Sequence, residues 1–77
     1  MSLEDIRKEI DIVDNQIKAL LKKRFNLAKK ALKFKDKIYD RKREKDIFSN
    51  IEEKEIKDIF KSILKNTKKI LNKIYKK

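Results

Sequence analysis

Cysteine, histidine, glycine, proline and tryptophan are all missing from this chain of 77 residues. Without cysteine or histidine there can be no disulfide, thiol nucleophile, imidazole base or usual zinc site, and a Ser-His-Asp triad is excluded. Loops that cradle phosphate groups need glycine, so they are excluded as well. Glycine and proline also interrupt helices, and their absence beside abundant leucine, isoleucine, lysine and glutamate favours an all-helical chain.

The charge of the chain is strongly positive. Lysine and arginine outnumber aspartate and glutamate by 24 to 13, which gives a net charge of +11. An excess of this kind is typical of nucleic-acid-binding proteins. The lysines are spread along the whole chain and form no single patch, so a solvated lysine-rich surface explains them equally well. A basic helical module that binds nucleic acid, or has another non-enzymatic role, is therefore kept as the alternative.

No segment is typical of an export signal or of a membrane span. The N-terminus is charged from Glu4 onward, unlike a signal peptide. No apolar run approaches the ~20 residues that a membrane span needs. We therefore expect a cytoplasmic protein without a membrane partner, folded as one small domain over residues 1–77.

The spacing of apolar residues predicts a long first helix. They recur every three or four positions from Leu3, which is the repeat of one helix face. Ser2 and Asp5 stand where a capping box would start such a helix. The pattern continues to about Lys35 or Lys37, so we expect a helix about 50 Å long.

Two shorter helices are predicted after the first. Asp40 is the expected N-cap of a short helix over residues 41–50. Asn50, followed by Glu53, predicts the cap of a third helix of medium length that continues to the C-terminus. The expected fold is thus all-α, with one long, one short and one medium helix.

The first helix also predicts an assembly of two chains. It is apolar along its full length and on more than one side. A monomer of this size would leave much of that surface in water. Pairing two long helices across a twofold axis would bury it, so we expect an intertwined homodimer.

Basic residues interrupt the apolar stripe of the first helix. Arg24 lies on this stripe between Leu21 and Ala28, and Lys35 returns to the same side three turns later, within about 20°. Charge on a core-facing stripe is costly unless something negative is held there. Arg24 and Lys35 are therefore predicted to face a pocket for a small anionic ligand.

Arg7 lies on the same helix but is badly placed for this pocket. It precedes Arg24 by seventeen residues, which puts it about 25 Å away and rotated by about 100°. In an antiparallel dimer, Arg7 of the partner subunit could reach the pocket. The alternative is a local role, in which Arg7 pairs with Glu4 or Asp11 at helical spacing.

Later segments add Arg43 and Glu44 on the short helix and Thr67 on the apolar face of the third. The set lacks a nucleophile–base pair and paired carboxylates at hydrolytic spacing. Taken singly, Lys35 and Thr67 have ordinary structural explanations, and Glu44 could pair with nearby lysines. Taken together, the residues would bind a compact dianion and stabilise charge that develops on it.

Two blocks of the sequence resemble the all-helical (AroQ-type) chorismate mutases. The first, from Leu3 to Ala28, is L-x-x-I-R-x-x-I-D-x-x-D-x-x-I-x-x-L-L-x-x-R-x-x-L-A, and the second, after Lys35, is the D-x-x-R-E block from Asp40 to Glu44. The resemblance implies a domain-swapped homodimer with two active sites, each borrowing one arginine from the partner. It implies the Claisen rearrangement of chorismate to prephenate, without cofactor or metal. Elimination of pyruvate from isochorismate, a related activity, stays open.

The resemblance also implies a role for each site residue. Arg24 and Arg7 of the partner subunit would grip the substrate carboxylates, with help from Arg43 and the Thr67 hydroxyl.

Three further positions concern the rest of the substrate. Lys35 would contact the ether oxygen, Glu44 would hold the substrate hydroxyl, and Asp40 would shape that corner of the pocket.

The family usually places glutamine or glutamate four residues beyond Thr67, as a second donor to the ether oxygen. This chain has Leu71 there, which predicts a slow enzyme.

Overall fold

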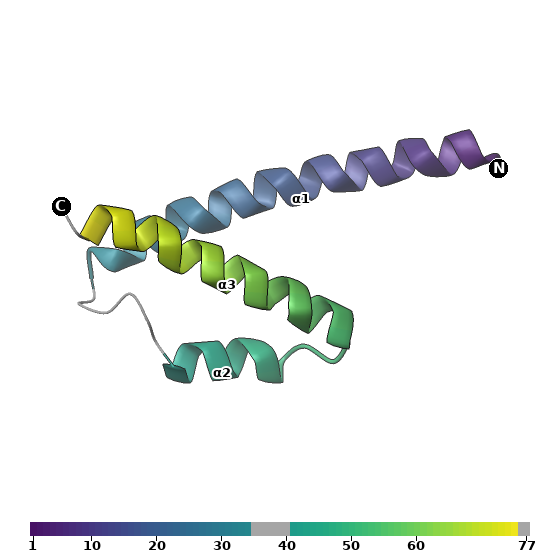
Figure 1. Cartoon of the computed structure of the whole chain (residues 1–77). Helices are drawn as coiled ribbons and strands as arrows, with labels where there is room; N and C mark the ends of the chain where they lie inside the picture. The colour runs from purple at the N-terminus through teal and green to yellow at the C-terminus, as the bar shows by residue number, and fades with distance from the viewer. Residues whose placement is uncertain (35–40, 76–77) are drawn as a thin grey trace.

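The computed structural model describes residues 1–34 and 41–75, and these residues form three helices without strands. Figure 1 shows the long helix α1 (Leu3–Leu32), the short helix α2 (Arg41–Ser49) and the medium helix α3 (Lys54–Tyr75). The predicted all-α fold with one long, one short and one medium helix is confirmed. No helix within the described ranges is long and apolar enough to cross a membrane.

The start of α1 is fixed by the predicted capping box. The Ser2 hydroxyl accepts a hydrogen bond from the Asp5 backbone N–H at 3.2 Å. In return, the Asp5 carboxylate accepts one from the Ser2 backbone N–H at 3.1 Å. Two backbone donors that a helix start leaves unsatisfied are thus satisfied by side chains.

The end of α1 differs from the prediction, because the helix stops at Leu32 and does not reach 35–37. Its last turn is tightened by i→i+3 hydrogen bonds. These bonds run from Lys33 N–H to the Lys30 carbonyl (3.2 Å) and from Phe34 N–H to the Ala31 carbonyl (3.0 Å). Phe34 is 91% exposed, so no packing favours another helical turn. Lys35 and Lys37 themselves lie outside the described residues.

The cap predicted at Asn50 is also wrong. The Asn50 N–H donates to the Ile47 carbonyl at 3.3 Å, so this residue closes α2 and does not open α3. The third helix begins at Lys54, and the Lys57 N–H donates to the Glu53 carbonyl at 3.1 Å. The predicted break between the two helices exists, but Glu53 takes the capping position. The predicted N-cap Asp40 lies outside the described residues.

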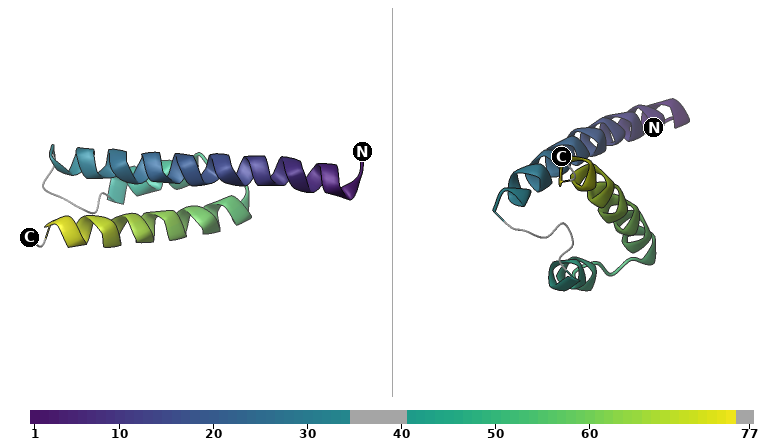
Figure 2. Two further views of the ribbon diagram at one scale, coloured as in Figure 1. Left: turned by 90° about the horizontal axis from the view of Figure 1, so that it is seen from above. Right: turned by 60° about the vertical axis from the view of Figure 1, so that its left-hand side comes forward.

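The helices α1 and α3 pack side by side, and their C-terminal ends come together (Figures 1 and 2). From there they diverge, so that the N-terminal half of α1 projects beyond α3. The short helix α2 lies on the side of α3, to which the ion pair between Glu44 and Lys68 connects it. The side chains that are buried among the described residues all belong to α3: Leu64, Thr67 and Leu71. Their spacing of three and four places them on one helix face.

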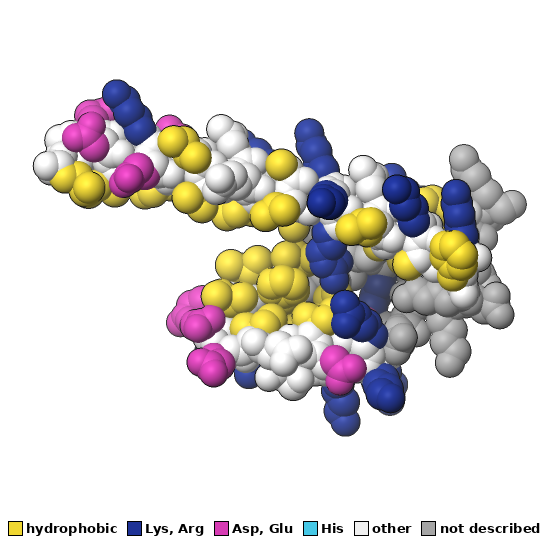
Figure 3. Space-filling view, turned by 180° about the vertical axis from the view of Figure 1, so that it is seen from behind, with side chains coloured by type: hydrophobic (Ala, Val, Ile, Leu, Met, Phe, Trp, Pro, Cys, Tyr) yellow, Lys and Arg dark blue, Asp and Glu magenta, His cyan; other side chains and the backbone are white. Residues whose placement is uncertain are grey.

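The chain is unusually open for its length. Its radius of gyration is 15.6 Å, whereas a compact domain of this size would have about 11.5 Å. Large apolar side chains of α1 remain exposed, among them Leu3, Ile10, Val13, Ile17 and Leu20. Figure 3 shows apolar side chains along the underside of the projecting helix and across the facing side of the lower helices.

Candidate active site

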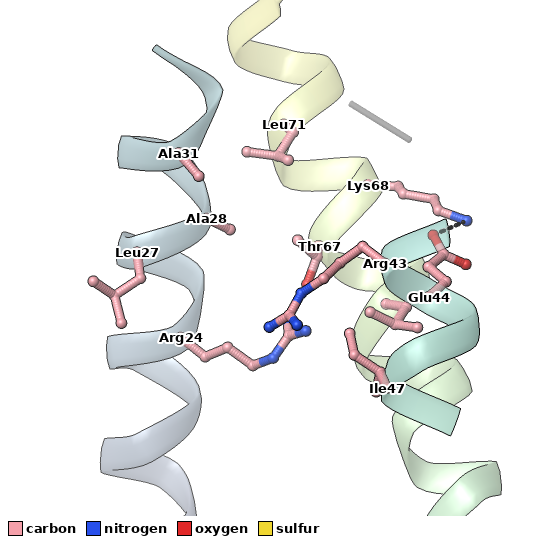
Figure 4. Close-up of a pocket in the computed structure, with 11 residues that line it drawn as sticks. Arg24, Leu27, Ala28, Ala31, Arg43, Glu44, Ile47, Thr67, Lys68 and Leu71 are labelled. Atoms are coloured by element: carbon pink, nitrogen blue, oxygen red, sulfur yellow. Dashed lines mark hydrogen bonds and ion pairs between the residues drawn. The ribbon is translucent and has the colours of Figure 1, made fainter. Parts of the chain in front are cut away.

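A cavity of about 310 Å³ lies between the three helices. Figure 4 shows α1 on one side and α2 and α3 on the other. Its apolar lining consists of Leu27, Ala28, Ala31, Ile47, Leu64 and Leu71. Its polar lining consists of Arg24, Arg43, Glu44, Thr67 and Lys68.

Arg24 is held across the contact between α1 and α3 by the Thr67 hydroxyl. Arg24 Nη1 donates to Thr67 Oγ1 at 3.1 Å. The same hydroxyl donates its proton to the Ile63 carbonyl, one turn earlier in α3, at 2.7 Å. Because that bond fixes the hydroxyl, its remaining acceptor capacity faces the guanidinium group. Thr67 therefore sets the position of Arg24 in the cavity.

The electrostatics of the cavity are dominated by two arginines. Partial burial lowers the pKa of Arg24 below its usual value, and the positive charge of Arg43 lowers it further. Figure 4 shows the two guanidinium groups next to each other in front of Thr67. Arginine remains charged at neutral pH. A bound anion at this point would relieve the repulsion between the two cations.

Glu44 is the carboxylate of the cavity, and it is paired. Its Oε2 lies 3.1 Å from Lys68 Nζ, so that the ion pair connects α2 to α3. Lys68 was not among the predicted site residues. In a chain with lysine at many exposed positions, only the placement of α2 beside α3 distinguishes this one.

The structure brings together four of the predicted site residues: Arg24, Arg43, Glu44 and Thr67. Arg7 is not with them. Its side chain is 65% exposed and lies 3.9 Å from Glu4, as the local alternative predicts. Lys35 and Asp40 lie outside the described residues, so their predicted roles stay predictions.

Leu71 lines the cavity one turn beyond Thr67 and is only 3% exposed. Its neighbour Ile70 lines a different groove, of about 640 Å³, between α1 and α3. The apolar part of that groove includes Leu21, Phe25, Ile59 and Ile63. The third helix therefore turns Leu71 toward the cationic cavity and Ile70 away from it.

The cavity lining has the composition of a site for a dianion. Three cations and one carboxylate leave a net charge of +2 on the side chains that line it. The lining contains no nucleophile–base pair. Within the described ranges, no cluster of acidic, cysteine or histidine residues could hold a metal ion. What this arrangement can do is bind, orient and stabilise negative charge.

Comparison with known proteins agrees with this chemistry. The family model for chorismate mutase type II matches residues 6–75. No curated protein and no solved structure gives a significant match. The matched range extends over nearly the whole chain and includes every residue of the cavity lining. This chain therefore belongs to the chorismate mutase type II family.

Proposed function

We propose that the protein catalyses the rearrangement of chorismate to prephenate in the cavity between its three helices. The observation that carries the proposal is the convergence of Arg24 and Arg43 beside Glu44, in a chain of this family. Chorismate is a dicarboxylate with one hydroxyl and one ether bridge. A cavity with a cationic centre and one carboxylate at its edge is complementary to these groups.

The reaction makes modest demands on the protein. It is intramolecular: the ether C–O bond breaks as a new C–C bond forms, and no atom, proton or electron leaves the molecule. No nucleophile or general base is needed. The enzyme has to hold a compact reactive conformer and supply positive potential where negative charge develops. The arginines of the described lining can hold the compact reactive conformer.

Arg24 is the central carboxylate-binding group in this proposal. Its guanidinium can donate two parallel hydrogen bonds to one carboxylate, and Thr67 keeps it oriented. Arg43, from α2, adds charge on the same side of the cavity. Because the Thr67 proton is used by the Ile63 carbonyl, Thr67 helps the substrate through Arg24.

The remaining roles concern the hydroxyl and the ether oxygen. Glu44 accepts a hydrogen bond from the substrate hydroxyl, and Asp40 shapes the adjacent corner of the site. Lys35 donates to the ether oxygen as the C–O bond breaks. Asp40 and Lys35 are proposed from the family resemblance, since both lie outside the described residues.

We also propose that the active form is a homodimer in which Arg7 of the partner subunit completes each site. Two observations support this assembly. The protomer is open, with a radius of gyration of 15.6 Å, and the apolar stripe of α1 is exposed. Arg7 lies on the projecting half of α1, far along the helix from Arg24. A second copy packed on that stripe would bury it.

The direct test is the loss of chorismate absorbance on adding the purified protein, with the product identified by chromatography. Prephenate is the expected product. A rate equal to the uncatalysed background at high protein concentration would refute the proposal. Release of pyruvate from isochorismate, without prephenate formation, would instead assign the related lyase reaction.

Two arginines of α2 provide a matched control. Arg43 lines the cavity, whereas Arg41 is exposed and does not. Replacing Arg43 by alanine removes a hydrogen bond to a charged group, so Arg43→Ala should lower kcat/KM by about 10-fold to 100-fold. Arg41→Ala removes the same charge from the same helix and should leave kcat/KM unchanged. Equal effects of the two variants would show that only overall charge matters.

A further inference from the structure

The ion pair between Glu44 and Lys68 differs from the other ion pairs of the described residues. Glu4–Arg7 and Asp58–Lys61 each lie within one helix, are 3.9 Å apart and have side chains that are more than half exposed. Glu44 and Lys68 join two different helices at 3.1 Å, with side chains only 19% and 34% exposed. Interactions between charges are screened less when the groups are partly buried. The ion pair with Lys68 is therefore placed to fix the position of the Glu44 side chain.

The same turn of α3 holds two groups of the cavity. Thr67 contacts Arg24 on the side toward α1, and the next residue, Lys68, contacts Glu44 on the side toward α2. Figure 4 shows the Lys68 side chain extending away from α1, with the guanidinium groups of Arg24 and Arg43 between the helices. Lys68 thus reaches Glu44 without occupying the space in front of the arginines.

One carboxylate oxygen of Glu44 is engaged by this contact. Lys68 Nζ lies 3.1 Å from Oε2, which is one of the two carboxylate oxygens. A carboxylate can accept several hydrogen bonds. The geometry therefore allows Glu44 to keep its contact with Lys68 while Oε1 accepts a bond from a ligand hydroxyl.

We propose that Lys68 is a positioning residue for Glu44. It holds the carboxylate at the α2–α3 edge of the cavity, where the carboxylate meets the substrate hydroxyl and stays away from the arginines. Without Lys68, Glu44 would turn toward Arg43 and Arg24, because they are the other two cations of the lining. It would then compete with the substrate carboxylates. This inference rests on the proposed function, and it adds a residue to the site.

The test is a double-mutant cycle with steady-state kinetics. Lys68→Met removes the charge but keeps a long side chain, and it should raise the KM for chorismate about fivefold to tenfold, with a smaller change in kcat. Lys68→Arg should restore most of the affinity. In a Glu44→Gln background, Lys68→Met should change kcat/KM by less than about twofold. Lys65→Met, an exposed position on the same helix, is the matched control and should be silent.

Two results would overturn the proposal. An equal loss from Lys68→Met in the wild-type and Glu44→Gln backgrounds would mean that Lys68 does not act through Glu44. Failure of Lys68→Arg to rescue, with the helical circular dichroism intact, would show that the charge is not what matters.

A spectroscopic readout separates this proposal from the proposed function. The ¹³C carboxyl resonance of Glu44 should shift in Lys68→Met and return toward its wild-type position in Lys68→Arg. If the wild-type protein does not consume chorismate, the proposed function fails, and this resonance alone decides the positioning role. An unchanged resonance in Lys68→Met would refute that role.

Discussion

The substitution Leu71→Gln should make this protein a faster enzyme. Leu71 lines the cavity one turn beyond Thr67 and is 3% exposed. The family resemblance implies a glutamine or glutamate at this position, as a second donor to the ether oxygen. Leucine offers no hydrogen bond, so in the proposed mechanism Lys35 is left as the only donor to that oxygen.

The size of the effect follows from the missing donor. Losing one donor to a developing oxyanion typically costs about 2.7–4 kcal/mol of transition-state stabilisation. A glutamine introduced here must also give up the apolar burial of leucine and bury an amide. We therefore expect only part of the full gain, an increase in kcat of at least about tenfold, or roughly 1.4 kcal/mol. The same change should lower the free energy of unfolding by about 1–3 kcal/mol.

The assay is the initial rate at saturating chorismate, which reports kcat. Ile70→Gln is the control, because Ile70 lines the other groove and its amide would not reach the cationic cavity. A gain from Ile70→Gln alone would mean that α3 is placed in the wrong register. If neither variant is faster and Lys35→Ala is also silent, the cavity is not the catalytic site.

Two further substitutions test the site and the assembly. Thr67→Val removes the acceptor that holds Arg24 and should lower kcat/KM about tenfold. Thr67→Ser keeps the hydroxyl and should stay near the wild-type value. Equal losses of kcat/KM in the two variants would exclude the hydroxyl as the cause. Ile17→Glu places a charge on the exposed apolar stripe of α1 and should shift sedimentation equilibrium from dimer to monomer, whereas the neighbouring Lys18→Glu should not. A wild-type protein that is already monomeric at micromolar concentration would contradict the dimer.

Much of the fold follows directly from the sequence. The apolar repeat of α1 is long and unbroken, and the Ser2–Asp5 box is a local signal that needs no tertiary contact. The site was partly predictable for a similar reason. Arg24 lies on a stripe of apolar residues, so it had to face the interior, and Arg43 and Glu44 belong to a recognisable block.

Other features depend on contacts that the sequence does not reveal. With no glycine or proline to mark a stop, the end of α1 is set by the lack of packing at Phe34. Asn50 has the side chain of a helix cap, but its backbone N–H is used to close α2. Lys68 is one lysine among many, and only the approach of α2 to α3 distinguishes it. The positive net charge suggested a nucleic-acid-binding module as the alternative function. The family match gives that alternative no support.

The central claim is that each active site is built from two chains, with Arg24 from one and Arg7 from the other. Mixing Arg7→Ala protein with Arg24→Ala protein, after unfolding and refolding together, tests it directly. In a mixed dimer, one site lacks both arginines and the other is intact. Random pairing should therefore restore about a quarter of the wild-type activity from two nearly inactive proteins. No recovery, despite mixed dimers proven by mass spectrometry, would contradict the shared site.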